Sequence, residues 1–132
     1  MKVLIADTDR DFALKAWAYY EKSANLVLLQ PDSDQVVASA RSWGADLVIV
    51  SARQVEQGVL EGLYALPARP AVLVTEHMRN PGRAWRAWQQ GGDELLLKPV
   101  FKLKELAQAV TNALGSAAWG RRAPWAKLAA SA

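Results

Sequence analysis

Four short apolar segments of this chain are each followed by polar side chains that could take part in chemistry. The segments read VLIA, LVIV, AVLV and LLL. Carboxylates accept hydrogen bonds and bind cations, hydroxyls donate and accept hydrogen bonds, and a lysine pairs with anions. The polar side chains that follow the four segments are Asp7, Thr8, Asp9, Ser51, Thr75 and Lys98.

These apolar segments, with a weaker fifth that reads LVLL, have the character of buried parallel strands. Each is a continuous apolar run rather than an alternation, as expected for a strand that is covered on both faces. The sequence therefore predicts strands at 3–6, 26–29, 47–50, 71–74 and 95–97.

The segments between these runs have helical spacing and recognisable ends. Residues 32–43 have Asp32 or Ser33 as a candidate N-cap and Gly44 as a stop. Residues 80–90 begin with Asn-Pro and end at a glycine pair. The last helix is predicted at 103–114, with Leu103, Leu106, Val110 and Leu114 on one stripe and its end at Gly115.

Alternating strands and helices predict one parallel sheet with helices on both faces. In such doubly wound sheets, ligands bind at the carboxyl ends of the strands. The six polar side chains named first should therefore converge at a single edge of the sheet.

The segments VLIADTD, DLVIVS, AVLVT and GGDELLLKPV, in this order and spacing, resemble the receiver domains of response regulators. These are chemotaxis-type domains that accept phosphate from a histidine kinase. The resemblance covers about residues 2–115 and implies a flavodoxin-like α/β fold with strand order 2-1-3-4-5. It also implies bacterial two-component signalling and a cis peptide bond before Pro99.

The resemblance assigns roles only where the residues match. Receivers hold an acidic pair after the first strand for Mg²⁺, a phosphoacceptor aspartate after the third, a hydroxyl after the fourth and a lysine after the fifth. Here Asp7, Thr75 and Lys98 match this pattern. Thr8 replaces the second acid and Ser51 replaces the phosphoacceptor, so the resemblance is to an atypical pseudo-receiver.

Hydroxyls thus replace two of the three carboxylates of such a site, which weakens both metal binding and phosphotransfer. Mg²⁺ prefers hard oxygen ligands that include carboxylates, so we expect weak or no Mg²⁺ binding, with Asp7 and Asp9 as weak candidate ligands. A serine is a poor nucleophile without an adjacent base. We expect no enzymatic activity, and Asp7 and Lys98 to neutralise each other, with hydrogen bonds from Ser51 and Thr75.

Ser51 itself leaves two interpretations open. Its hydroxyl either satisfies backbone groups where the strand ends or serves as a target for a serine kinase.

Trp85, Trp88 and Leu95 are candidates for an interaction face. In receivers, the fourth helix, fifth strand and fifth helix form the usual docking and dimerisation surface, and an aromatic switch residue stands near the position of Leu95. An exposed Trp88 would give that surface a fixed apolar patch.

Composition limits the remaining possibilities. The 132 residues are 52% hydrophobic with a net charge of +3, include no cysteine, and are expected to form one receiver-like domain at 1–115. No apolar run reaches the ~18 residues of a membrane span, so we expect a cytoplasmic protein. Residues 116–132 are predicted to be a basic, disordered tail, whose candidate contact residues are Trp119, Arg121, Arg122, Trp125 and Lys127.

The sequence therefore predicts a phosphorylation-independent receiver that binds protein partners in a signalling pathway, with a homodimer through the candidate face as one form. Three alternatives stay open. Asp9 or another acid could accept phosphate, a small α/β enzyme or nucleotide binder could use the same edge, or the tail could bind nucleic acid or an anionic membrane surface. The second is disfavoured, because the acidic segment ADTDRDF after the first strand would repel phosphate.

Overall fold

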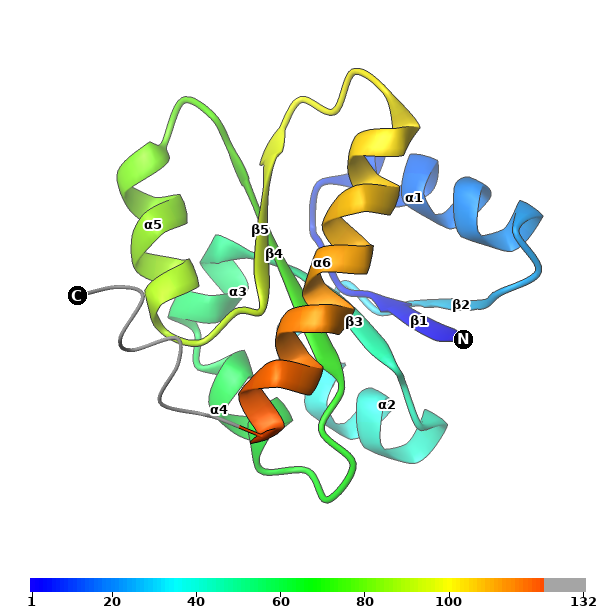
Figure 1. The fold of residues 1–132 in the computed structure, drawn as a ribbon, viewed down its shortest axis with the longest axis vertical. Coiled ribbons are helices and arrows are strands. Elements are labelled where there is room, and N and C mark those ends of the chain that lie inside the picture. Colours follow the sequence, from blue (N-terminus) through cyan, green and yellow to red (C-terminus); the bar gives the residue numbers. More distant parts are fainter. Residues whose placement is uncertain (123–132) are drawn as a thin grey trace.

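A five-stranded parallel sheet forms the centre of the computed structural model, which describes residues 1–122 (Figure 1). Its strand order is β2-β1-β3-β4-β5, and every neighbouring pair is parallel. This confirms the predicted flavodoxin-like fold class. The strands are β1 (Lys2–Ile5), β2 (Leu26–Leu29), β3 (Leu47–Ser51), β4 (Ala71–His77) and β5 (Glu94–Lys98).

The central strands form because their residues are apolar on both faces. All five residues of β3 are buried, and β4 is buried from Ala71 to Thr75. Branched side chains pack well on such a pleated surface, and burial of both faces explains why these runs do not alternate with polar residues.

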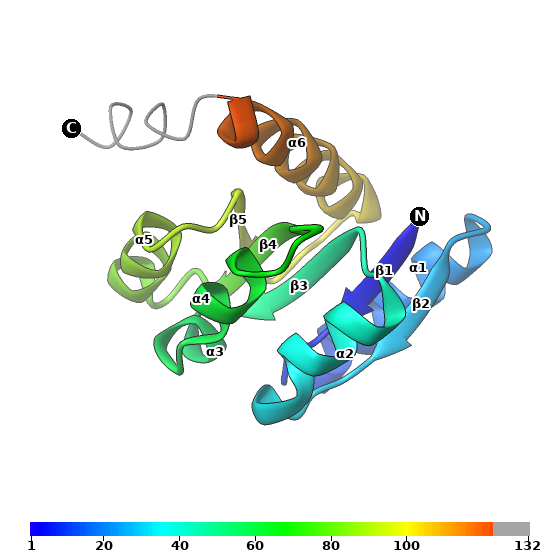
Figure 2. The same cartoon turned by 90° about the horizontal axis from the view of Figure 1, so that it is seen from below.

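Helices cover both faces of this sheet (Figure 2). Val3 and Ile5 pack in one cluster with apolar residues of α1 and α6, whereas Leu4 packs in a second cluster with residues of α2, α3, α4 and α5. The helical elements are α1 (Arg10–Lys22), the 3-10 turn η1 (Ser33–Gln35), α2 (Val36–Trp43), α3 (Ala52–Glu56), α4 (Val59–Tyr64), α5 (Pro81–Gln89) and α6 (Leu103–Arg122).

Two of the predicted helices, at 32–43 and 80–90, are present with small differences in their bounds. The helix predicted at 32–43 starts with η1, capped by Asp32, before α2 ends as predicted at Gly44, whose φ of 74° is in the left-handed region. The segment between β3 and β4 contains two short helices. The helix predicted at 80–90 is α5, with Pro81 in its first turn as expected.

The predicted end of the last helix at Gly115 is wrong, because α6 continues to Arg122. An interior glycine costs a helix about 1 kcal/mol, which packing can offset. The packing comes from Ala113 and Ala117, which are both buried, whereas Leu103 and Leu114 of the predicted stripe are exposed. The predicted disordered tail is therefore helical from residue 116 to Arg122. The other tail residues named above, Trp125 and Lys127, lie outside the described residues, as do the side chains of Arg121 and Arg122.

Within residues 1–122, no helix combines the length and the apolar character needed to cross a membrane.

Candidate functional site

The predicted polar side chains come together at the carboxyl edge of the sheet. Asp7, Thr8 and Asp9 follow β1, Ser51 ends β3, and Lys98 ends β5. These five residues line one pocket of about 270 Å³ together with Arg53, Glu76 and Arg83. Thr75 lies beside this pocket in β4 and is fully buried. The sheet therefore positions all six candidate side chains as the strand pattern predicted.

Lys98 pairs with both aspartates of this pocket. Its Nζ atom lies 3.1 Å from Oδ2 of Asp7 and 3.2 Å from Oδ2 of Asp9. It also lies 5.1 Å from the ring centroid of Phe12, which is a cation–π distance. The side chain of Asp7 is completely buried and that of Lys98 is 9% exposed. The predicted neutralisation of Asp7 by Lys98 is confirmed in this geometry.

Both carboxylate oxygens of Asp7 have partners from the protein itself. The Thr75 hydroxyl donates a short hydrogen bond to Oδ2, and the backbone amide of Asp9 donates to Oδ1 at 3.0 Å. A buried charge is tolerated when its counter-ion and hydrogen bonds are in place. Asp7 is thus a satisfied anion at the centre of the site.

Asp9 contributes to local structure as well as to the pocket. Its side chain caps α1 by accepting a hydrogen bond from the Phe12 amide at 3.3 Å. Partial burial raises the pKa of the Asp9 carboxyl, but the Phe12 amide and the Lys98 ammonium outweigh this effect, so its pKa lies below the ordinary value of 3.8. Asp9 therefore stays ionised at neutral pH.

Ser51 acts as the N-cap of α3. Its hydroxyl accepts a hydrogen bond from the Gln54 amide at 3.3 Å, while Oε1 of Gln54 accepts from the Ser51 backbone amide at 2.9 Å. This is a complete capping box. The expectation that Ser51 satisfies backbone groups at the strand end is confirmed, but it does not hydrogen-bond within the Asp7 and Lys98 pair.

Gln54 is a site residue that the sequence analysis missed. It is 1% exposed, and its Nε2 atom donates to the carbonyl oxygen of Ala6 at 2.6 Å, which joins α3 to the residue after β1. The signal was present in the sequence, since Ser51 followed by glutamine three residues later is a capping-box pattern.

Replacing Gln54 by alanine should destabilise the fold by about 2–4 kcal/mol, since it leaves a cavity and unpaired groups at Ala6 and Ser51. Ser51→Ala should cost only about 1 kcal/mol, because it removes an N-cap hydroxyl whose hydrogen bonds are both to Gln54 at 3.3 Å and leaves the bond from the Ser51 backbone amide to Gln54 in place. Urea denaturation checks both values, with the exposed Gln57→Ala as a matched control. Equal losses for Gln54→Ala and Gln57→Ala would contradict this role.

Three charged residues of the pocket were also missed, since nothing in the strand-end pattern points to them. Arg83 of α5 lies 3.2 Å from Glu56 of α3 and 3.8 Å from Glu76 of β4, and so connects three elements at the pocket mouth. Arg53 is exposed on α3. His77 is the last residue of β4, where its Nδ1 accepts a hydrogen bond from the Arg79 amide.

The side chains of this pocket fit a Mg²⁺ ion poorly. The ion needs several free oxygen ligands, and usually one or two carboxylates. Asp7 has both oxygens engaged, Asp9 contacts Lys98, and the positions of Thr8 and Ser51 supply hydroxyls. In the described part of the chain, no three acidic or histidine side chains cluster closely enough to hold a metal ion.

The three candidate interface residues lie in α5 and β5. Trp85 is 50% exposed, and its ring centroid lies 5.2 Å from that of Trp88. Trp88 is only partly exposed, and Leu95 packs against the cluster beneath α5. The prominent aromatic on this face is therefore Trp85, whereas the sequence analysis placed it at Trp88.

This sheet order, with an acid after β1 and a lysine at the end of β5, is that of the receiver fold of response regulators, which solved receiver structures share with this chain. The peptide bond between Lys98 and Pro99 is cis. The cis bond was implied by the resemblance and is confirmed. No known family model and no curated protein sequence matches the chain.

Several solved structures are similar to it. NtrX from Brucella abortus, solved in complex with ADP, has a TM-score of 0.78 and 18% identity, over 92% of this chain and 28% of that one. A response-regulator receiver domain from Bermanella marisrubri has a TM-score of 0.73 and 15% identity, over 86% of this chain and 97% of that one. A two-component response regulator from Clostridium difficile has a TM-score of 0.69 and 19% identity, over 86% and 95% of the two chains. These likenesses show that the fold is shared.

Proposed function

We propose that this chain is a pseudo-receiver that acts in two-component signalling through contacts with other proteins, without being phosphorylated. The observation that carries the proposal is that the polar side chains of the site form hydrogen bonds and an ion pair with groups of this same chain. Lys98 and Thr75 both bond to Asp7, and Ser51 is committed to capping α3. The side chains at the positions that bind or accept a phosphoryl group in receivers are thus already hydrogen-bonded within this chain.

The chemistry of Ser51 supports this proposal. Nucleophilic attack by a serine needs a base within hydrogen-bond reach. The hydroxyl lies 3.3 Å from Oε1 of Gln54, which is a neutral amide and a very weak base. Phosphoryl transfer also depends on charge neutralisation by metal ions, for which this pocket has few ligands. The proposal therefore includes weak or no binding of Mg²⁺ and no enzymatic activity.

Incubation of the purified chain with labelled acetyl phosphate and millimolar Mg²⁺ tests the proposal. We expect no label on the protein by intact mass or by gel, and no shift of its melting temperature. A labile phosphorylated form that requires Mg²⁺ would overturn the proposal and would favour Asp9 as a non-standard acceptor.

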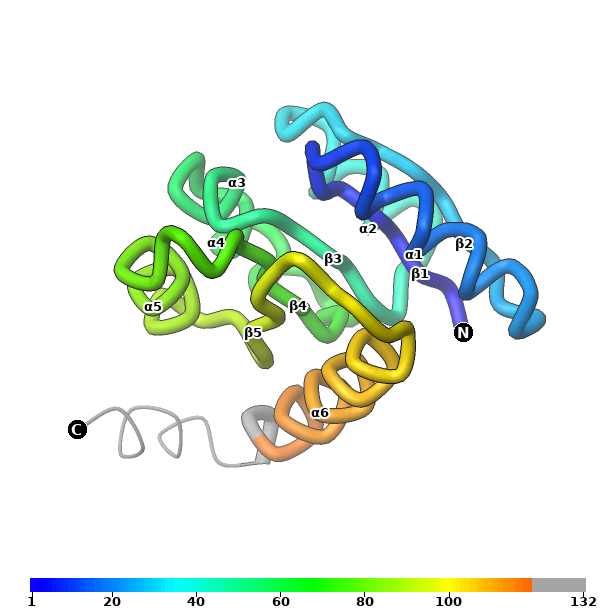
Figure 3. Tube along the Cα trace, turned by 90° about the horizontal axis from the view of Figure 1, so that it is seen from above, coloured from blue at the N-terminus to red at the C-terminus, as the bar shows by residue number. Residues whose placement is uncertain are grey.

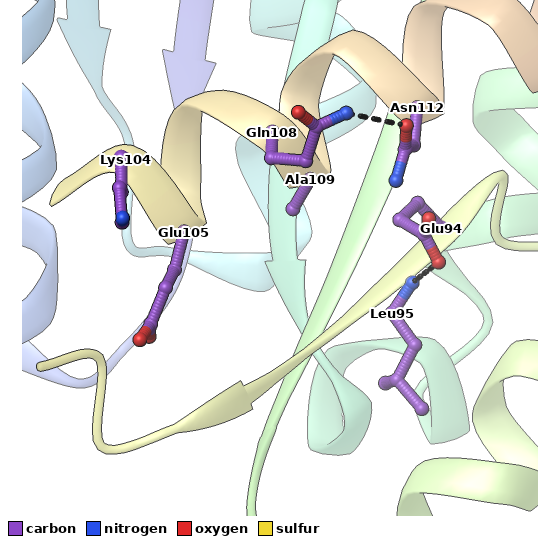
Figure 4. A pocket seen from close by; sticks show the side chains of 7 residues that line it. All are labelled: Glu94, Leu95, Lys104, Glu105, Gln108, Ala109 and Asn112. Atoms are coloured by element: carbon purple, nitrogen blue, oxygen red, sulfur yellow. Dashed lines mark hydrogen bonds between the residues drawn. The ribbon is translucent and has the colours of Figure 1, made fainter. Parts of the chain in front are cut away.

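The surface formed by α5, β5 and α6 is the proposed contact region. Beside β5 it contains a groove of about 450 Å³, in which Gln108 and Asn112 of α6 are joined by a hydrogen bond (Figure 4). Glu94 and Glu105 line this groove together with Lys104, whereas α5 carries arginines and no acidic residue. A two-fold dimer would bring the basic helix of one copy against the two glutamates of the other.

Trp85→Asp should abolish self-association through this surface, because it places a charge in the centre of the proposed apolar contact. Sedimentation velocity over a range of concentrations measures the effect, and the melting temperature should stay unchanged because Trp85 is half exposed. Leu14→Asp on α1, exposed to a similar degree at 44%, is the control and should still dimerise. A wild-type chain that stays monomeric would contradict the dimer.

A further inference from the structure

The loop from β5 to α6 carries a second candidate surface, which does not include Trp85. Figure 3 shows this loop crossing the molecule toward the start of α6. Phe101 in the loop is 77% exposed, more than any other large apolar side chain in the described part of the chain, and Leu103 at the start of α6 is 45% exposed. Isolated exposed apolar residues are common, so their surroundings decide their meaning.

This loop is held in place on both sides of Phe101. Before it, Lys98 is buried against Asp7, and the carbonyl oxygen of Lys98 accepts a hydrogen bond from the Met78 amide at 2.9 Å. Val100 packs on the core between α1 and α6. After it, the Glu105 amide donates to the carbonyl oxygen of Lys102 at 2.9 Å. Phe101 is thus presented by an ordered segment, which lowers the entropy cost of binding a partner.

The charged residues that follow Phe101 most closely in the chain are two lysines, with the exposed Glu105 next in the first turn of α6. Lys102 and Lys104 are exposed on either side of Leu103, and neither forms an ion pair with any residue in the described part of the chain. Arg79 is exposed on the adjacent loop after β4, where it bonds to His77 rather than to an acid. An apolar pair bordered by unpaired cations complements a segment that is both apolar and acidic.

We propose that Phe101 and Leu103, bordered by Lys102 and Lys104, form a docking site for an acidic segment of another protein that carries large apolar side chains. The aromatic ring and the leucine take the apolar side chains, and the two lysines take the carboxylates. The site lies at the start of α6.

A protein segment fits this site better than a membrane surface or a nucleic acid. The acidic start of α1 borders the same edge, because Lys98 contacts Asp9 and lies over the ring of Phe12, and Asp11 is exposed in the first turn. A surface of phosphates would meet these carboxylates as well as the lysines. A short peptide can place its charges on the lysines alone.

Selection of a random peptide-display library on the immobilised full chain tests the proposal. We expect the enriched peptides to combine several Asp or Glu residues with Phe, Leu or Trp. The strongest peptide is then synthesised with a fluorophore, and its affinity is measured by anisotropy. Phe101→Ser and the double change Lys102→Glu and Lys104→Glu should each weaken it by about tenfold or more, as for a central contact residue.

Matched control variants lie on α1. Leu14→Ser and Lys15→Glu change an exposed apolar residue and an exposed lysine, and each should leave the affinity within about twofold, as expected for positions outside a contact region. Enrichment of basic or uncharged peptides, absence of any enriched peptide, or acidic peptides insensitive to Phe101→Ser would each overturn the proposal. A membrane surface as the true ligand would also overturn the proposal. In that case the chain would bind no peptide but would cosediment with phosphatidylglycerol vesicles, and Phe101→Ser would abolish this cosedimentation.

Discussion

Replacing Lys98 by methionine is expected to destabilise the protein by about 3–5 kcal/mol, the range found when one partner of a buried ion pair is removed. The carboxylate of Asp7 is 0% exposed, and in this variant it would keep only the hydrogen bonds from Thr75 and from the Asp9 amide. Methionine fills a similar volume, so the loss reports the unpaired charge rather than a cavity. Urea denaturation at neutral pH measures it.

A double-mutant cycle separates this effect from a general loss of packing. Adding Asp7→Asn to Lys98→Met removes the unpaired charge and should restore much of the lost stability, giving a favourable coupling energy of about 1–3 kcal/mol between the two residues. The exposed Lys15→Met is the matched control and should cost less than about 0.5 kcal/mol. If Lys98→Met lowers the free energy of unfolding no more than Lys15→Met does, the ion pair of Lys98 and Asp7 does not stabilise the site.

Restoring the two missing acids should create a Mg²⁺ response that the wild-type chain lacks. The double variant Thr8→Asp and Ser51→Asp adds two carboxylates to a pocket that already contains Asp7 and Asp9. Their mutual repulsion lowers stability without a cation and favours the binding of one. Aspartate is as good an N-cap as serine, so α3 should be retained.

Thermal melting with and without Mg²⁺ measures this response. Saturation to ten times the dissociation constant should stabilise the double variant by about 1.4 kcal/mol. The variant with Thr8→Asn and Ser51→Asn has nearly the same shape without the charges and should not respond. A wild-type chain that gains as much from Mg²⁺ as the double variant would show that the hydroxyls at these positions are no obstacle to the ion.

The strand and helix pattern of this chain predicted most of the fold, because each signal is local in the sequence. Continuous apolar runs marked all five strands, and Asn80 with Pro81 marked the start of α5. The end of α6 was missed because Gly115 is a stop signal only when nothing packs beyond it. The burial of Ala117 is a tertiary fact, and it outweighs the local cost of the glycine.

The sequence by itself determined which polar groups reach the carboxyl edge of the sheet, since strand order and direction fix where each strand ends. It also determined that two of the expected acids are hydroxyls. It further predicted that Lys98 pairs with Asp7, because both groups reach that edge. Only the tertiary structure decided the remaining contacts. Lys98 also pairs with Asp9, 89 positions away in the chain, and Gln54 bonds to Ala6, 48 positions away, and no local pattern shows either contact. Folding joins them because a buried charge or carbonyl must find a partner once water is excluded.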